Sequence, residues 1–284
     1  MKKLLTSLIL FQLVAHGQPK TKRVIMEGSG QPILLLNGGT FDMTSFASHS
    51  KLLLHSFRVI RMEQFNTQYA DEGLSLPKNY SVKTESDAIE TTLDSIHINE
   101  SIILVGHSYG GVIAFDFALN HPDRIRALVL IEPPLYGIPK AKGEFTEGMK
   151  QRENFLKQLT PQAKITEDLV KRFRCELLNC DTFDIHQHPL WAGWIKQKDR
   201  LKGLSAVANY QIDFKKLHDF QKPVLIITGS ETVAFHKKVD ELLTREFSNS
   251  STASLLGGHT SIYQNAGAFI QILTAFLRAN TNGY

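Results

Sequence analysis

The sequence has few cysteines, no apolar run long enough to span a membrane, and no concentration of charge of one sign. Only two of its 284 residues are cysteine, which excludes a fold held together by several disulfides. Its 32 basic and 28 acidic residues give a net charge of +4. They are scattered, without the basic stripe typical of nucleic-acid binding, so we expect no nucleic-acid partner. The 42% of hydrophobic residues is enough for one sizeable core.

The N-terminus carries a short apolar segment after a basic start. Residues 4–15 follow Lys2 and Lys3, and the small residues Ala15 and Gly17 precede Gln18. This pattern is typical of a secretory signal peptide, and it is short of the about 20 apolar residues that a spanning helix needs. We expect residues 1–17 to be removed, the chain to be exported to the periplasm or secreted, and no stable membrane insertion to remain. The alternative is an N-terminal anchor or a buried helix.

From residue 18 onward, short apolar runs alternate with helical patterns. The apolar runs predict strands at 33–36, 58–62, 101–105, 127–131, 223–228 and 252–256, and the periodicity between them predicts helices at 81–97, 109–120, 233–247 and 261–278. Strands without polar alternation are buried on both faces, as in a parallel sheet covered by helices. The sequence therefore predicts an α/β fold with a mostly parallel central sheet flanked by helices.

One long stretch interrupts this alternation. Residues 135–221 contain helical patterns, for example at 150–159 and 166–178, but no convincing strand, and they are rich in aromatic residues. We expect a helical cap inserted between two strands of one sheet. The core would then consist of residues 18–134 and 222–284.

The stretch 106–110, GHSYG, follows a predicted buried strand directly and opens a predicted helix. A strand–turn–helix context is what a nucleophile elbow requires, because the turn pushes the serine hydroxyl out above the strand end. The start of the helix also presents unpaired N–H groups and a positive dipole near that serine. Ser108 is therefore the candidate nucleophile, with an ordinary loop serine as the alternative.

A serine needs a base to remove its proton, and that base needs an acid to orient it. His259 lies in the segment Gly257–Thr260 between the last predicted strand and the last predicted helix, so it is the candidate base. Two glutamates are candidates for the acid. Glu231 follows the strand at 223–228, and Glu132 ends the strand at 127–131.

The oxyanion of an acyl-transfer intermediate needs two preorganised donors. The backbone N–H of Tyr109, which follows the serine, is the first candidate. The second should come from the segment Asn37-Gly38-Gly39-Thr40 after the first buried strand, with Gly39 preferred and Thr40 as the alternative.

Together these residues resemble the α/β-hydrolase superfamily in the order Ser, acid, His, over residues 24–277. The segment beginning GHSYGG is similar to that of lidded, single-domain members. The resemblance implies Ser108 as nucleophile, His259 as base, and Gly39 and Tyr109 as the oxyanion hole. Family members most often place an aspartate at the position of Thr232, which cannot serve. A minority place the acid where Glu132 stands, and we prefer Glu132 over Glu231 on that likeness.

The resemblance implies a serine hydrolase for a small, largely apolar ester, thioester, lactone or amide, acting through an acyl-enzyme on Ser108. Carbon–carbon bond hydrolysis or acyl transfer on the same residues is an alternative, and a non-catalytic binding protein on this scaffold is another.

We expect neither cofactor nor metal. The residues Cys180, Asp181, Asp184, His186 and His188 are metal-ligand types, but their spacing fits no compact zinc pattern. In an oxidising compartment Cys180 is instead able to pair with Cys175; two free thiols are the alternative.

Overall fold

The computed structural model describes residues 8–9, 21–178 and 180–281. The predicted signal peptide, residues 1–17, therefore lies outside the described residues except for Leu8 and Ile9, which form the short strand β1. In the part of the chain that is described, no helix combines the length and the apolar character needed to cross a membrane.

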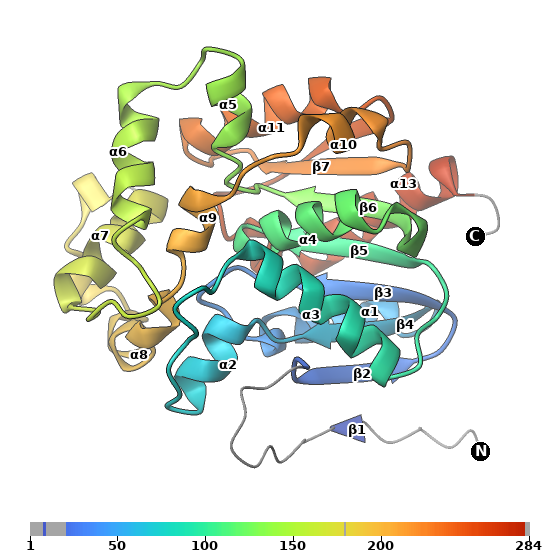
Figure 1. Cartoon of the computed structure of the whole chain (residues 1–284), viewed down its shortest axis with the longest axis horizontal. Helices are drawn as coiled ribbons and strands as arrows, with labels where there is room; N and C mark the ends of the chain where they lie inside the picture. The colour runs from blue at the N-terminus through green and yellow to red at the C-terminus, as the bar shows by residue number, and fades with distance from the viewer. Residues whose placement is uncertain (1–7, 10–20, 179, 282–284) are drawn as a thin grey trace.

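A central sheet forms the middle of the molecule (Figure 1), with its strands in the order β1-β2-β4-β3-β5-β6-β7-β8. The strands from β3 to β8 run parallel, and β2 pairs antiparallel with both β1 and β4. The strands are β1 Leu8–Ile9, β2 Val24–Gly28, β3 Gln31–Leu36, β4 Phe57–Met62, β5 Ile102–His107, β6 Ile125–Ile131, β7 Val224–Gly229 and β8 Ser250–Leu255.

Helices cover both faces of this sheet. The α-helices are α1 Ala47–Leu53, α2 Phe65–Asp71, α3 Val82–Ser95, α4 Tyr109–Asn120, α5 Gly137–Ala141, α6 Glu147–Leu156, α7 Glu167–Leu178, α8 Trp191–Lys196, α9 Ser205–Asn209, α10 Phe214–Asp219, α11 Ala234–Glu246, α12 Ser261–Gln264 and α13 Ala266–Asn280. Short 3-10 turns occur at η1 Met43–Phe46, η2 Pro122–Arg124, η3 Cys180–Thr182, η4 Ile185–Gln187 and η5 Lys198–Leu201.

Two separate apolar clusters correspond to the two faces. Side chains of α3, α4 and α11 pack on one face of the sheet, and those of α1 and α13 pack on the other. All six residues of β5 are buried, as expected for a strand covered on both sides. The predicted fold class, a mostly parallel sheet flanked by helices, is confirmed.

One strand and one helix illustrate where the structure differs from the sequence-based expectation. The antiparallel strand β2 was not predicted, because most of its side chains are only partly buried and it shows no continuous apolar run. The predicted helix 261–278 is two helices, α12 and α13, separated at Asn265. The side-chain amide of Asn265 donates to the carbonyls of Leu256 and Ser261, both at 3.0 Å, and this competes with a continuous helix.

Between β6 and β7 the described residues form only helices and turns, from α5 to α10. Helices α6, α7, α8 and α9 gather at one end of the sheet, on the left in Figure 1. Cys175 in α7 and Cys180 in η3 form a disulfide in this segment.

Candidate active site

Ser108 lies at a sharp turn between β5 and α4, with φ 53° and ψ −120°. Such a conformation costs a non-glycine residue roughly 1–3 kcal/mol. The Ser108 N–H donates to the carbonyl of Ile131 at 2.9 Å, which ties the turn to β6. A Cβ atom at Gly106 would collide with the backbone of Gly110, and one at Gly110 would collide with the backbone of Leu36 and Asn37. The two glycines therefore let the turn close.

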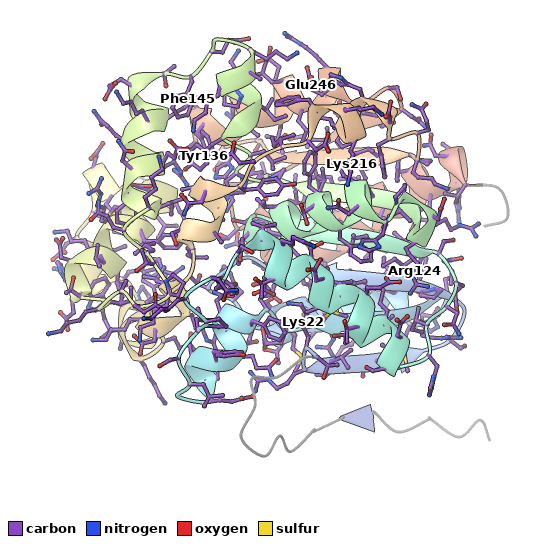
Figure 2. The ribbon with its side chains drawn as sticks, viewed as in Figure 1. Lys22, Arg124, Tyr136, Phe145, Lys216 and Glu246 are labelled. Carbon is purple, nitrogen blue, oxygen red and sulfur yellow. A yellow bond between two sulfur atoms is a disulfide. The ribbon has the colours of Figure 1, made fainter. Side chains whose placement is uncertain are left out.

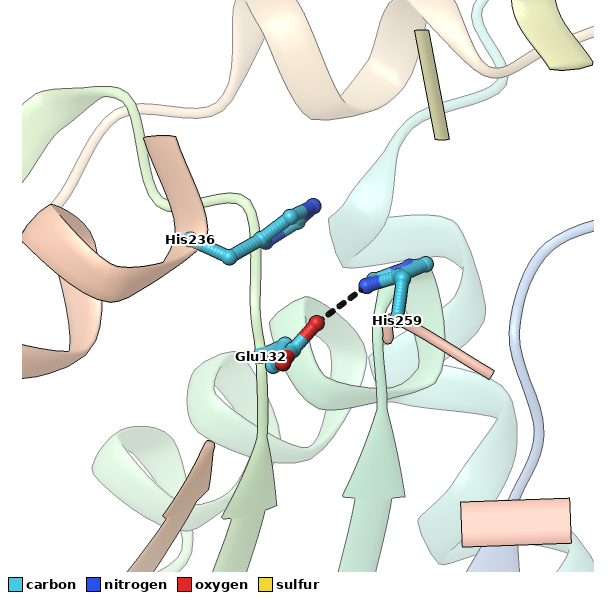
Figure 3. Close-up of side chains that lie close together, drawn as sticks. All are labelled: Glu132, His236 and His259. Atoms are coloured by element: carbon cyan, nitrogen blue, oxygen red, sulfur yellow. Dashed lines mark hydrogen bonds and ion pairs between the residues drawn. The ribbon is translucent and has the colours of Figure 1, made fainter. Parts of the chain in front are cut away.

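His259, in the segment between β8 and α12, reaches Ser108 from across the sheet. Its Nε2 lies 3.0 Å from Ser108 Oγ, and its Nδ1 lies 2.5 Å from Glu132 Oε2. Figure 3 shows Glu132 at the end of its strand with its carboxylate directed at His259. Because an ionised carboxylate only accepts hydrogen bonds, Nδ1 carries the proton and Nε2 is left to accept the serine proton.

The Glu132 carboxylate is held on both sides. Its Oε1 accepts the N–H of Gly229 at 2.6 Å, and its Oε2 also accepts the hydroxyl of Thr232 at 2.8 Å. Glu132 is 1% exposed and has a positive φ of 48°, which turns its side chain from the strand end toward the histidine. Glu231, the alternative acid, is exposed, and its N–H donates to the carbonyl of Gly257. The structure thus brings Ser108, His259 and Glu132 together.

The two candidate oxyanion donors line the same small cavity as Ser108. Tyr109 is the first residue of α4, so its N–H has no acceptor within the helix. The Gly38–Gly39 peptide is fixed because the Gly38 carbonyl accepts from Phe41 N at 3.0 Å and from Asn37 Nδ2 at 3.1 Å. Thr40, the alternative donor, lines a different cavity.

The side chain of Tyr109 is anchored at its hydroxyl. Its hydroxyl lies 2.8 Å from that of Tyr80, and Tyr80 in turn donates to Glu85. Glu85 is fully buried and also contacts Lys22, which is labelled in Figure 2. This buried network fixes the residue that follows Ser108.

A chain of hydrogen bonds joins the segment that carries His259 to the segment that carries Gly38. His107 Nε2 lies 2.8 Å from the carbonyl of His259, and its Nδ1 lies 2.9 Å from the hydroxyl of Tyr263. Because a carbonyl only accepts, Nε2 carries the proton and Nδ1 accepts from Tyr263. The same hydroxyl accepts the N–H of Gly38 at 2.9 Å. Both ring nitrogens of His107 are therefore occupied by groups other than Ser108.

A second histidine, His236 of α11, stacks on His259. Their ring centroids are 4.2 Å apart and their planes differ by 19°. Burial, together with the nearby His259, lowers the pKa of both His107 and His236 well below the ordinary value. Both rings therefore stay neutral, and neither repels a positive charge on His259. Nothing in the helical pattern of the sequence distinguishes His236 from its neighbours. Neither His236 nor Tyr263 was predicted to be part of the site.

Glu132, His236 and His259 are also the residue types that bind metal, and their ligand atoms lie within 4.8 Å of one another. A bound metal must lie in the plane of each imidazole that ligates it. The two rings are nearly parallel and stacked (Figure 3), so their lone pairs do not converge on one point. The candidate cluster around Cys180 lacks its thiolate, because Cys180 is bonded to Cys175.

The cavity around Ser108 is small, about 40 Å³. Its apolar wall comes mainly from the segment 135–221 and consists of Pro134, Leu156, Phe173, Leu177, Leu204 and Val207. A larger cleft of about 830 Å³ lies outside it and includes Phe145, which Figure 2 labels. Arg152 and Glu176 line both spaces, so this pair stands between the cleft and the serine.

A family model described as alpha/beta hydrolase fold matches residues 31–165. Over 118 residues the chain is 27% identical to a cis-3-alkyl-4-alkyloxetan-2-one decarboxylase of Shewanella oneidensis, a segment that covers 42% of this chain and 37% of that protein. It is 25% identical over 259 residues to the putative carbamate hydrolase RutD of Serratia proteamaculans, covering 88% of this chain and 92% of that one. The chain thus spans little more than a third of the first relative and nearly all of the second.

Among solved structures, a thermophilic esterase from Thermogutta terrifontis superposes with a TM-score of 0.70 at 18% identity. The match covers 97% of this chain and 99% of the esterase. At that identity the likeness concerns the fold.

Proposed function

The chain belongs to the α/β-hydrolase superfamily, and from that premise we propose that it is a serine hydrolase that forms an acyl-enzyme on Ser108. The observation that carries the proposal is the continuous series of contacts from Ser108 Oγ through the two nitrogens of His259 to Glu132, at 3.0 and 2.5 Å. The relatives named above include proteins called a hydrolase and an esterase, which supports the same class of reaction.

In the proposed mechanism, His259 Nε2 takes the hydroxyl proton while Ser108 Oγ attacks the substrate carbonyl. The oxyanion accepts hydrogen bonds from the N–H groups of Gly39 and Tyr109. His259 then gives its proton to the leaving group, and a water molecule releases the acyl group by the same route. Glu132 stabilises the imidazolium that forms transiently on His259.

We propose that residues 135–221 act as a cap that selects the substrate. Apolar side chains such as Leu156, Leu204 and Val207 line the space beside Ser108. They favour an ester, thioester, lactone or amide whose acyl part is small and largely apolar. The Gly39 position is also closed by this segment, because a Cβ there would come within 2.6 Å of Leu204 Cδ2.

The chain is further proposed to act in an oxidising compartment, the periplasm or the extracellular space. The Cys175–Cys180 disulfide supports this, because such bonds persist mainly in secreted and periplasmic proteins. Determining the N-terminal residue of protein recovered from each cell fraction tests both export and cleavage after Gly17. A full-length chain confined to the cytoplasm contradicts it.

The enzymatic proposal is tested with p-nitrophenyl esters of acyl length C2 to C12, using the wild-type protein and Ser108→Ala. We expect hydrolysis by the wild type that is lost in the variant, with an optimum at short chains. Ester hydrolysis that persists unchanged in Ser108→Ala contradicts the mechanism. If the enzyme accepts none of these esters, a serine-reactive phosphonate should still label Ser108. The absence of labelling at Ser108 would also contradict the mechanism.

A further inference from the structure

Arg174 of α7 is a buried cation without a counter-ion. It is 8% exposed, and no acidic side chain pairs with it among the described residues. Its Nε is buried and has no hydrogen-bond partner there either. The guanidinium is held instead by aromatic rings, with Cζ 4.6 Å from the centroid of Trp194 and 5.5 Å from that of Phe173.

The other buried cations of the described chain all have acidic partners. Lys22 contacts Glu85, and Arg61 contacts Glu27 at 2.7 Å. Arg200 contacts Asp71 at 2.9 Å and Asp42 at 3.3 Å. Burying a charge without such a partner is costly, and burial alone lowers the pKa of Arg174 to about 10. A partner for Arg174 is therefore expected from outside the chain.

Arg174 faces a cavity of about 370 Å³ between the segment 40–45 and helices α7 and α8. This volume is within the range of small-molecule sites, roughly 300–1,000 Å³. The wall also contains Asp42, but its carboxylate is already occupied by Arg200 and by the N–H of Thr44 at 3.0 Å. Arg174 is thus the unpaired charge in this wall.

We propose that this cavity is an anion-binding site in which Arg174 takes a carboxylate or phosphate group of a small ligand. The guanidinium presents a planar set of donors that matches both groups. Contact with the Trp194 ring restrains the guanidinium before the ligand arrives, so little side-chain entropy is lost on binding.

The cavity adjoins the proposed active site. Gly39 lines the space around Ser108 while Thr40 lines the Arg174 cavity, and the same relation holds for Phe173 and Arg174. The anion is therefore either the far end of the substrate or a separate ligand bound beside the oxyanion loop. That the anion is part of the substrate rests on the proposed function, whereas the existence of the anion site does not.

Direct binding is measured through Trp194, which touches the guanidinium. The chain has two tryptophans, so Trp191→Phe leaves Trp194 as the sole tryptophan reporter. Titration with glutarate or inorganic phosphate at constant ionic strength should give a saturable change in its emission. Arg174→Gln should abolish the change, whereas Arg172→Gln, on the same helix but paired with Glu176 at 3.7 Å, should keep it. A response that is absent, unsaturable or unaltered in Arg174→Gln overturns the proposal.

Thermal unfolding gives an independent readout that requires no activity. Saturating anion should raise the Tm of the wild type and of Ser108→Ala equally, and it should leave the Tm of Arg174→Met unchanged. Without anion, Arg174→Met should be at least as stable as the wild type, because the uncompensated charge is gone. An Arg174→Met protein that is destabilised and still stabilised by the anion would overturn the proposal by a second route.

Kinetics separate the two sources of the anion. If the anion belongs to the substrate, Arg174→Gln should raise KM for the p-nitrophenyl half-ester of glutaric acid at least tenfold more than KM for p-nitrophenyl butyrate. If it is a separate ligand, Arg174→Gln should affect both esters equally, and phosphate should alter butyrate hydrolysis only when Arg174 is present. Either result supports the site, provided that Trp194 reports binding.

Discussion

The hydroxyl of Thr232 donates to Glu132 Oε2 across a distance of 2.8 Å. Thr232 occupies the position where the family resemblance would place an aspartate. The side chain at this position therefore donates to the candidate acid and does not itself accept from the histidine. It now supports an acid supplied by the neighbouring strand.

Glu132 and Glu231 are distinguished by matched substitutions. We expect Glu132→Gln to lower kcat by about 10⁴-fold, because an amide disfavours the His259 tautomer that accepts the serine proton. Glu231→Gln should leave kcat within about twofold, since the side chain is exposed. Steady-state hydrolysis of p-nitrophenyl butyrate measures both, with circular dichroism to verify folding. The reverse pattern would make Glu231 the acid.

Thr232→Val should lower kcat by about tenfold. It removes one hydrogen bond to the carboxylate, typically about 1–1.5 kcal/mol, while the bond from Gly229 N remains. Thr228→Val is the control, because that hydroxyl serves Asp240 at 2.6 Å instead. An equal loss of kcat in both variants would mean that the effect arises from packing rather than from Glu132.

His49 should make the protein less stable at acid pH. Burial lowers its pKa to about 4, so between pH 6.5 and 4 the unfolded chain binds a proton that the native chain does not. The free energy of unfolding therefore falls as pH falls through this window, by up to about 3 kcal/mol. His49→Gln should remove this dependence, measured as the difference in urea unfolding between wild type and variant. If the difference in the free energy of unfolding between wild type and His49→Gln does not change with pH, the prediction is wrong.

Glu63 should change stability with pH in the opposite direction to His49, over an overlapping pH range. Burial raises its pKa to about 7, so between pH 4.5 and 7 the native chain holds a proton that the unfolded chain has released. Its contribution to stability is present below pH 4.5 and is lost as pH rises toward 7. Glu63→Gln should therefore gain stability relative to wild type as pH rises. Urea unfolding of the same pair at pH 4.5 and 7.5 checks the sign.

The disulfide should stabilise the capping segment modestly. Chain-entropy arguments for a loop of this size give about 2 kcal/mol, and Cys175→Ala with Cys180→Ala should lower the free energy of unfolding by that order. The matched control is the wild type unfolded under a reducing agent, which should coincide with the double variant. Unchanged stability in both would mean that the crosslink leaves the unfolded chain unconstrained.

The sequence sufficed for features that depend on local pattern. The continuous apolar strands predicted the parallel sheet, and the glycines around Ser108 predicted the turn, because its sharpness is a local steric requirement. Local pattern did not decide whether Glu132 or Glu231 is the acid, and that choice rested on the family resemblance. That choice depends on the positive φ of Glu132 and on a hydrogen bond from Gly229, neither of which has a local signature.

Contacts between distant segments were missed for the same reason. His236 and Arg174 lie in helices whose patterns have ordinary apolar and polar faces, and Tyr263 lies in a predicted helix. Their partners, His259, Trp194 and Gly38, are close only in the folded chain. Sequence periodicity records which face of a helix is buried, but not what a buried polar group meets.

The space beside Ser108 is about 40 Å³, far below the roughly 300–1,000 Å³ of typical small-molecule sites. Ser108 itself is partly exposed, so its hydroxyl is accessible, but the acyl part of an ester has little room beside it. A larger acyl group would fit only after the surrounding side chains move, and kcat/KM for such a substrate would then be the intrinsic value multiplied by the fraction of molecules in the wider conformation. Substitutions that loosen the helices far from Ser108 would raise that fraction and act as accelerators without touching the reacting atoms.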